Sequence, residues 1–163
     1  MKQDYFDKIS QYILENQDKF YRLAYSNVEN PQDAMDVVQN AICKALGHAG
    51  ELRDIRALKT WFYRILMNES INFLRKNRRE LLVEEFADEE TYICMQEYDQ
   101  TENLNERLKV LPVEVQNIIR LRFYEELSLQ EIAEVTGRNL NTVKAKLYRG
   151  LKTLRVDLEG LEL

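Results

Sequence analysis

Proline and glycine are scarce in this sequence, with two and five copies among 163 residues. Turn-rich β proteins use both residues often, so their scarcity argues against a β-sandwich or barrel. Leu, Glu, Lys, Arg and Gln are abundant instead, and these side chains favour helices. The composition therefore predicts an all-α protein.

Cysteine and histidine are scarcer still. The chain has two cysteines, Cys43 and Cys94, and one histidine, and their positions do not fit the spacing of a tetrahedral metal site. We expect no cofactor and no bound metal. So few cysteines are also typical of a protein from the reducing cytoplasm.

Long apolar runs are missing as well. No segment approaches the roughly 18 to 20 apolar residues of a membrane span, and the opening residues, MKQDYFDKIS, contain no apolar stretch. We therefore expect neither export nor insertion into a membrane, and a cytoplasmic location.

The formal net charge of -5 conceals three blocks of charge along the chain. Residues 53–79 contain eight basic and two acidic side chains, whereas residues 80–102 contain nine acidic side chains and no Lys or Arg. From residue 138 to residue 155, all six charged side chains are basic. Two basic modules thus flank an acidic connector, which is compatible with a nucleic-acid partner despite the overall acidity.

This charge pattern predicts two small helical domains, residues 1–82 and 103–163, joined by an acidic linker at 83–102. Self-repulsion and weak periodicity favour a mostly extended linker. Whether the linker does more than tether the domains is open at this point.

The first domain is predicted to hold three helices after a variable lead-in. The first covers about residues 16–30 and ends at the Asn30-Pro31 step, and Pro31 can open the second. In that second helix, apolar side chains at three- and four-residue spacing form one buried stripe: Ala34, Val37, Val38, Ala41, Ile42 and Ala45. Asp36, Gln39, Asn40 and Cys43 point the other way, either simply solvated or part of a binding face.

The third helix, about residues 55–78, is predicted to bury Leu58, Trp61, Phe62, Ile65 and Phe73. Another face carries a polar and cationic stripe formed by Thr60, Arg64, Asn68 and Arg75. Together with the aromatic run 61–63, this stripe suits phosphate contact and base stacking on melted DNA.

The second domain has the pattern of a helix-turn-helix followed by a long basic helix, in the segment SLQEIAEVTGRNLNTVKAKLYRGLKTL. Ser128 and Glu131 form a capping box, and Gly137 supplies the left-handed residue of the turn. Leu129, Ile132 and Ala133 are expected to face the core. So are Leu140, Val143, Leu147, Leu151 and Leu154 of the second helix, supported upstream by Leu108, Leu111, Val115, Ile118, Ile119 and Phe123. Thr142, Ala145 and Arg149, flanked by Asn141, Lys146 and Lys152, then form an outer face that suits a major groove, with Lys144 nearer the core edge.

Three segments together resemble regions 2 and 4 of the extracytoplasmic-function sigma factors of bacterial RNA polymerase. They are YRLAYSNVENPQDAMDVVQNAICKAL, LKTWFYRILMNESINFLRKNRR and LPVEVQNIIRLRFYEELSLQEIAEVTGRNLNTVKAKLYRGLKTLR. The resemblance covers most of the chain and includes the order and spacing of the family's segments. It also extends to the absence of the domains that larger sigma factors carry. It implies a non-enzymatic protein that directs transcription initiation at a regulon of envelope-stress type.

The resemblance also implies which residues bind which partner. The clamp coiled coil of the largest polymerase subunit would contact Asp33, Asp36, Val37, Gln39 and Asn40. The minus-ten promoter element would contact Lys59, Thr60, Arg64, Asn68, Asn72 and Arg75, helped by the loop at about 47–56. The minus-thirty-five element would contact Arg138, Asn139, Asn141, Thr142, Lys144, Ala145, Lys146 and Arg149.

Further partners follow from the same resemblance. The helix-turn-helix domain would also touch the flap of the second polymerase subunit, the linker would run toward the RNA exit path, and an anti-sigma factor would hold the chain inactive. Met35 stands where the family commonly has an acidic residue, so one polar contact to the polymerase is missing. The chain also departs from residues common in the family at Asn72, Asn141 and Ala145, so base preference is not carried over.

Two hypotheses from other classes of protein compete with this one. A stand-alone helix-turn-helix regulator would bind duplex DNA as a dimer, but an acidic chain with two small cationic patches should bind weakly alone. An enzyme acting on nucleic acid would need His48 as a base or Asp33 and Asp36 as a metal pair. Neither arrangement has the further ligands or motifs that such chemistry requires.

Overall fold

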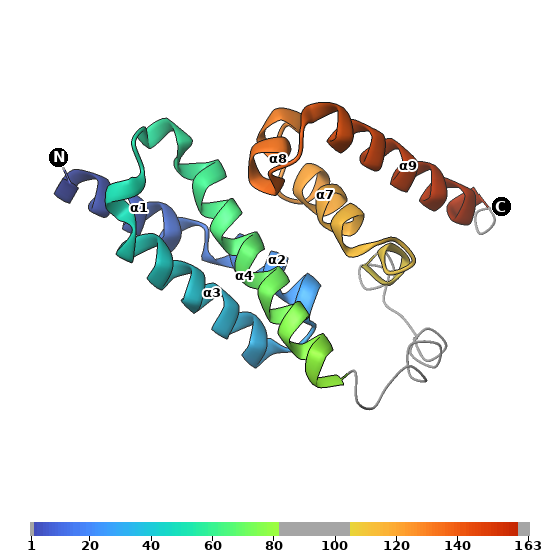
Figure 1. Cartoon of the computed structure of the whole chain (residues 1–163), viewed down its shortest axis with the longest axis horizontal. Helices are drawn as coiled ribbons and strands as arrows, with labels where there is room; N and C mark the ends of the chain where they lie inside the picture. Colours follow the sequence, from blue (N-terminus) through green and yellow to red (C-terminus); the bar gives the residue numbers. More distant parts are fainter. Residues whose placement is uncertain (1, 82–104, 160–163) are drawn as a thin grey trace. The chain divides into compact units, whose positions relative to one another are not determined.

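The computed structural model describes residues 2–81 and 105–159, and these contain helices and connecting turns but no β-strand (Figure 1). The predicted all-α class is therefore confirmed. The chain divides into two compact units, Met1–Val83 and Glu84–Leu163. The predicted acidic linker, 83–102, lies outside the described residues.

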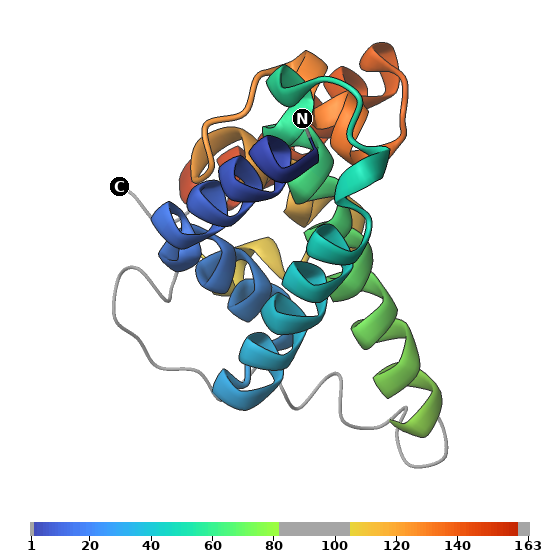
Figure 2. The ribbon, with the colours of Figure 1, turned by 90° about the vertical axis from the view of Figure 1, so that its left-hand side faces the viewer.

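The first unit is a helical bundle. It comprises α1 (Lys2–Glu15), α2 (Gln17–Val28), α3 (Pro31–Gly47), the short 3-10 turns η1 (Ala49–Glu51) and η2 (Ile55–Ala57), and α4 (Leu58–Leu81). Helices α2, α3 and α4 pack on one another, while α1 covers α3 and η1 (Figure 2). At the centre the rings of Phe20 and Phe62 lie 4.5 Å apart, and Tyr63 meets Phe20 edge-on at 5.4 Å.

The break between α2 and α3 forms as the sequence predicts. Glu29 adopts a left-handed conformation, with φ of 54°, and its N–H donates to the carbonyl of Tyr25. The Asn30 side chain then accepts a hydrogen bond from the Asp33 N–H at 3.0 Å, and Pro31 starts α3. The expected stripe of α3 is buried except for Ile42, which is half-buried.

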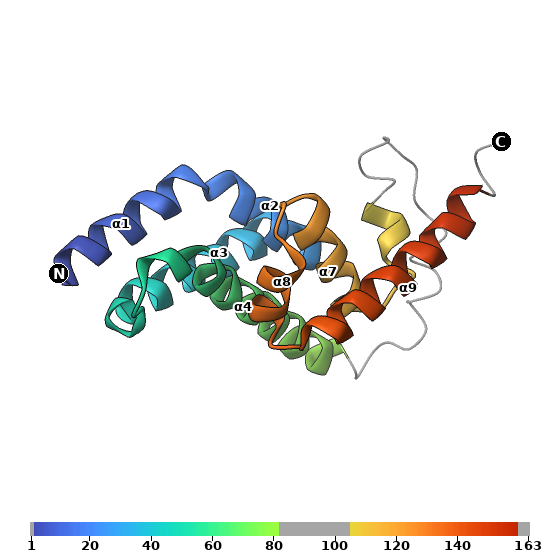
Figure 3. The same cartoon turned by 90° about the horizontal axis from the view of Figure 1, so that it is seen from above.

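Helix α1 was not predicted, since the lead-in was expected to be variable. Ile9 and Ile13, one turn apart, are 0% and 3% exposed and attach α1 to the bundle. Figure 3 shows α1 continuing directly toward α2, with a short break near Asn16. A fourth helix thus completes the core of this unit.

The core face of α4 was predicted only in part, since Leu58 and Phe62 are buried as expected. Trp61, Ile65 and Phe73 are only half-buried. Among residues 58–77, the buried side chains are Leu58, Phe62, Tyr63, Leu66, Met67 and Ser70. Because residues 61–67 are apolar almost all round the helix, spacing alone does not fix which side faces inward.

The second unit contains the helix-turn-helix. After helical residues 105–108 come α7 (Val113–Phe123), α8 (Leu129–Thr136) and α9 (Leu140–Glu159), and α7 packs on both α8 and α9. Pro112 occupies the N-cap position of α7. The expected core is buried apart from Leu129, Leu140 and Leu151, which are half-buried, and Phe123, which is 54% exposed. The prediction for Phe123 was wrong because α7 ends there and the chain turns away.

A buried arginine binds the first described residue of this unit. Arg120 is 1% exposed, and its guanidinium donates to the amide oxygens of Asn105 at 2.8 Å and Gln116 at 3.1 Å. Neutral amide oxygens surrounding a buried cation compensate part of its lost hydration. This residue lies outside the charge blocks and the predicted apolar stripes, so its burial was not predicted.

Within residues 2–81 and 105–159, no helix combines the length and apolar character that crossing a bilayer demands.

Candidate nucleic-acid interface

The outer face of α3 is polar and exposed. Asp36, Gln39 and Asn40 project from it, and the Gln32 amide donates to Asp36 at 3.3 Å. Asp33 is half-buried in the first turn. Val37 is only 2% exposed and belongs to the core, so its side chain cannot take part in a surface contact. The expectation that Val37 binds a partner is corrected accordingly.

An ion pair fixes α3 against α4. Lys44 of α3 contacts the carboxylate of Glu69 in α4, and the Glu69 side chain is 11% exposed. Glu69 is one of the two acids inside the basic block at 53–79. Its charge is therefore directed toward α3, which leaves the outer side of α4 cationic.

That outer side of α4 carries the predicted polar stripe. Arg64, Asn68, Asn72 and Arg75 are exposed. Lys59 and Thr60, one turn earlier, are half-buried, and the Thr60 hydroxyl donates to the carbonyl of Ala57 at 3.2 Å. The structure thus places these six residues along nearly five turns of one helix.

The aromatic run next to this stripe behaves differently from the prediction. Phe62 is 0% exposed and Tyr63 is 2% exposed, so neither ring can stack on a base. Trp61 is half-buried and is the one ring of the run with accessible surface. Within residues 61–63, only Trp61 is therefore accessible enough to stack on a base.

The loop between α3 and α4 is held by its own hydrogen bonds. Asp54 caps η2 by accepting from the Arg56 N–H at 2.9 Å, and it binds the Arg56 guanidinium through both oxygens at 3.2 and 3.0 Å. These bonds with the Arg56 side chain and backbone lower the pKa of Asp54. The loop expected to meet the minus-ten element is thereby shaped before any DNA arrives.

The helix-turn-helix forms through the local signals that predict it. The Ser128 N–H donates to the Glu131 carboxylate at 2.8 Å, and the Glu131 N–H donates to the Ser128 hydroxyl at 3.1 Å. Gly137 has φ of 72° and ends α8. The side chain of Asn139 caps α9 by accepting from the Thr142 N–H at 2.8 Å, so one of its polar atoms is committed to the helix start.

The face of α9 away from α7 is accessible. Asn141, Ala145 and Arg149 are exposed, whereas Thr142, Lys144 and Lys146 are half-buried. Tyr148 is 60% exposed beside Arg149 and was not singled out from the sequence. Its position outside the buried stripe of Val143, Leu147 and Leu154 was the available signal.

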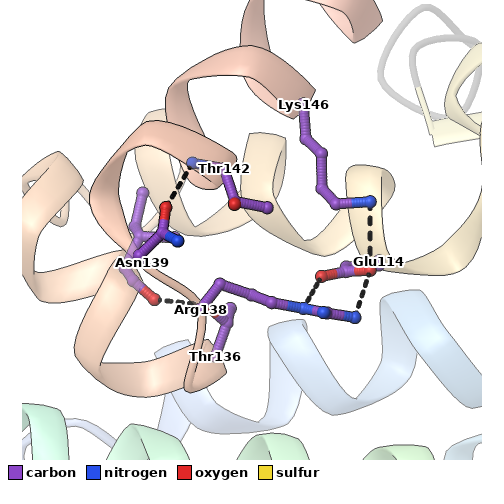
Figure 4. A network of polar contacts seen from close by, with 7 residues as sticks. Glu114, Thr136, Arg138, Asn139, Thr142 and Lys146 are labelled. Carbon is purple, nitrogen blue, oxygen red and sulfur yellow. Dashed lines mark hydrogen bonds and ion pairs between the residues drawn. The ribbon is translucent and has the colours of Figure 1, made fainter.

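An acidic side chain contacts two of the predicted DNA-binding cations. Glu114 in α7 accepts from Nε and Nη2 of Arg138 at 2.6 and 3.2 Å, and Lys146 Nζ lies 3.4 Å from the same carboxylate (Figure 4). No sequence signal pointed to this contact, because 24 residues separate Glu114 from Arg138.

Family models match both units of the chain. Residues 12–80 match sigma-70 region 2, and residues 101–154 match sigma-70 region 4. RNA polymerase sigma factor SigV of Bacillus subtilis is 42% identical over 146 residues, which cover 90% of this chain and 88% of SigV.

The chain belongs to the extracytoplasmic-function group of the sigma-70 family.

Other relatives agree with this assignment. The ECF sigma factor SigW of Bacillus subtilis is 28% identical over 162 residues, covering 88% of this sigma factor and 85% of SigW. Among solved structures, the sigma factor RpoE in complex with the anti-sigma factor NepR from Bartonella quintana matches the fold with a TM-score of 0.76. That match has 20% identity and covers 96% and 99% of the two chains.

Family membership decides among the three classes weighed from the sequence. A sigma factor is a transcription initiation factor, so the chain is not an enzyme. A stand-alone regulator would leave residues 1–82 without a role, whereas region 2 of the family accounts for most of them. In the described part of the chain, no three His, Cys, Asp or Glu side chains gather in a way that could hold a metal ion.

Proposed function

We propose that this sigma factor brings core RNA polymerase to its promoters through three separate surfaces. The outer face of α3 binds the clamp coiled coil, the stripe of α4 binds the opened minus-ten element, and α9 reads the minus-thirty-five element. The observation that carries this proposal is that exposed polar or cationic helix faces lie on both units of an otherwise acidic chain.

The exposed side chains of α3 define which of its residues can contact the polymerase. Asp36, Gln39 and Asn40 form the accessible part, with Asp33 at its edge. Few hydrogen bonds within the chain occupy these side chains, so they can bond across an interface. Binding to core polymerase supplies the affinity that the DNA contacts lack, because an acidic protein with small cationic patches binds duplex DNA weakly by itself.

The DNA contacts divide by type. On α4, Arg64 and Arg75 serve phosphates, and Asn68, Asn72 and Trp61 lie where unpaired bases would pass. On α9, Asn141, Ala145 and Arg149 are accessible to base edges, with Lys144 and Thr142 nearer the backbone. Glu114 engages Arg138 and Lys146, and the backbone N–H of Thr142 engages Asn139; we assign these three residues of the turn and α9 to phosphate contact.

The cellular setting follows from this role. We place the protein in the cytoplasm, where the polymerase acts, and include the flap of the second polymerase subunit among its contacts. RpoE of Bartonella quintana was solved with the anti-sigma factor NepR, which supports a partner of that class here. An envelope-stress regulon is part of the same proposal.

The α3 assignment can be tested with Gln39→Ala. Truncating a polar side chain at the centre of an interface should weaken core binding by about 5- to 30-fold, or about 1 to 2 kcal/mol. Gln17→Ala, at an exposed glutamine on α2, is the matched control and should bind as the parent does. Fluorescence anisotropy with labelled chain and core polymerase measures both. Equal affinities for the two variants would rule out this docking face.

A further inference from the structure

The Glu114 carboxylate lies between two cations of the helix-turn-helix unit. Arg138 in the turn bonds both of its oxygens, at 2.6 and 3.2 Å, and Lys146 on α9 approaches to 3.4 Å (Figure 4). We propose that Glu114 is a positioning residue that holds these cations as one phosphate-binding pair and limits their affinity for DNA of any sequence. This inference rests on the proposed role of α9 at the minus-thirty-five element.

The contact leaves both cations able to bind phosphate. A guanidinium has five N–H donors, and the two-point contact with Glu114 uses two of them. The Arg138 side chain is 52% exposed, so its remaining donors are accessible. Two parallel bonds also fix the plane of the guanidinium, which a single bond would not. Glu114 thus orients a side chain that would otherwise sample many rotamers in an exposed turn.

The contact also sets the charge of this surface. Two cations and one carboxylate give a net charge of +1, whereas Arg138 and Lys146 without Glu114 would give +2. Added positive charge strengthens binding to every sequence, because the backbone charge is the same everywhere, whereas the orientation of Arg138 matters only where α9 lies in register on its element. The carboxylate therefore lowers affinity for non-promoter DNA while the exposed face of α9 continues to read bases.

If Glu114 only stabilised the fold, its loss would change unfolding rather than DNA binding. Exposed ion pairs contribute little to stability, and all three of these side chains retain solvent access. Loss of Glu114 should therefore leave the fold intact. A change in DNA binding without a change in unfolding would separate the two roles.

The experiment compares Glu114→Gln with Glu134→Gln in holoenzyme reconstituted from the full chain and core polymerase. Glu134 is exposed on α8, so its variant removes the same charge without touching Arg138 or Lys146. The probes are two DNA duplexes, one with the minus-thirty-five element of a promoter selected from a library and one with that element scrambled. Binding is measured across a fourfold range of salt concentration.

Glu114→Gln should bind the scrambled duplex more tightly and discriminate less well between the two duplexes. Its logarithmic salt dependence should steepen by up to about 0.9, which adds about a 3.5-fold loss of affinity over the fourfold salt range. Glu134→Gln should match the parent. Glu114→Asp, which keeps the charge on a shorter side chain, should lose affinity for the matched duplex alone.

Run-off transcription by the parent holoenzyme distinguishes a failure of the proposed function from a failure of the role assigned to Glu114. Absence of transcription would refute the proposed function itself. Normal transcription, with Glu114→Gln identical to Glu134→Gln in salt dependence and discrimination, would overturn the assignment of Glu114. Loss of binding to both duplexes in Glu114→Asp would overturn it as well.

Discussion

Replacing Gly150 by alanine tests how closely α7 and α9 must approach. An ideal Cβ at position 150 would lie 2.6 Å from Cγ1 of Val115 and 3.2 Å from Cδ1 of Ile119. Carbon atoms prefer about 3.5 to 4.0 Å, and Val115 is β-branched and cannot easily rotate away. Overpacking of this kind costs about 1 to 3 kcal/mol, and alanine regains about 1 kcal/mol of helix propensity. We place the steric cost in the upper part of its range and expect a net loss of about 1 to 2 kcal/mol.

The chain provides a matched control and a local readout. Gly47, at the end of α3, has no atom within 4 Å of its ideal Cβ, so Gly47→Ala adds the same methyl group in open space and should not destabilise. Hydrogen exchange of amides in α7 and α9 reports the second unit, while the fluorescence of Trp61 reports the first. Stability of Gly150→Ala at or above that of the parent would refute the proposed packing constraint.

Three further changes give independent checks. Glu126 has φ of 58°, so Glu126→Gly should stabilise the second unit by about 0.5 to 1 kcal/mol, since relief of left-handed strain exceeds the added chain entropy; an unchanged urea midpoint would contradict this. Arg149→Ala should weaken binding of holoenzyme to a matched minus-thirty-five element by about 1 to 3 kcal/mol without altering stability, and equal loss on a scrambled element would indicate phosphate contact instead. The pKa of Asp54 is lowered, so its bonds to Arg56 stabilise the fold at pH values above 3.8, the ordinary pKa of this group. This stabilisation is lost as the pH falls through the lower pKa of the folded state. An NMR titration should place the Asp54 midpoint below 3.8 and return it toward that value in Arg56→Ala.

The helix-turn-helix was predictable because its signals are local. The capping box of Ser128 and Glu131 and the left-handed Gly137 act within a few residues of the chain, and each forms as expected. The Asn30-Pro31 start of α3 is predictable for the same reason.

Features that depend on packing were not predictable in the same way. The inward side of α4 is set by where α2 places Phe20, which the sequence of α4 does not contain. Predicting helix α1 depended on recognising Ile9 and Ile13 as an apolar stripe, and two residues alone give a weak pattern. The contact of Glu114 with Arg138 joins residues 24 positions apart, and only the fold brings them together.

Association with core RNA polymerase tests the central claim most directly. The purified chain, titrated into core enzyme, should form a stoichiometric complex that initiates transcription from promoters selected out of a DNA library. A chain that folds but neither binds core polymerase nor initiates transcription would contradict the account.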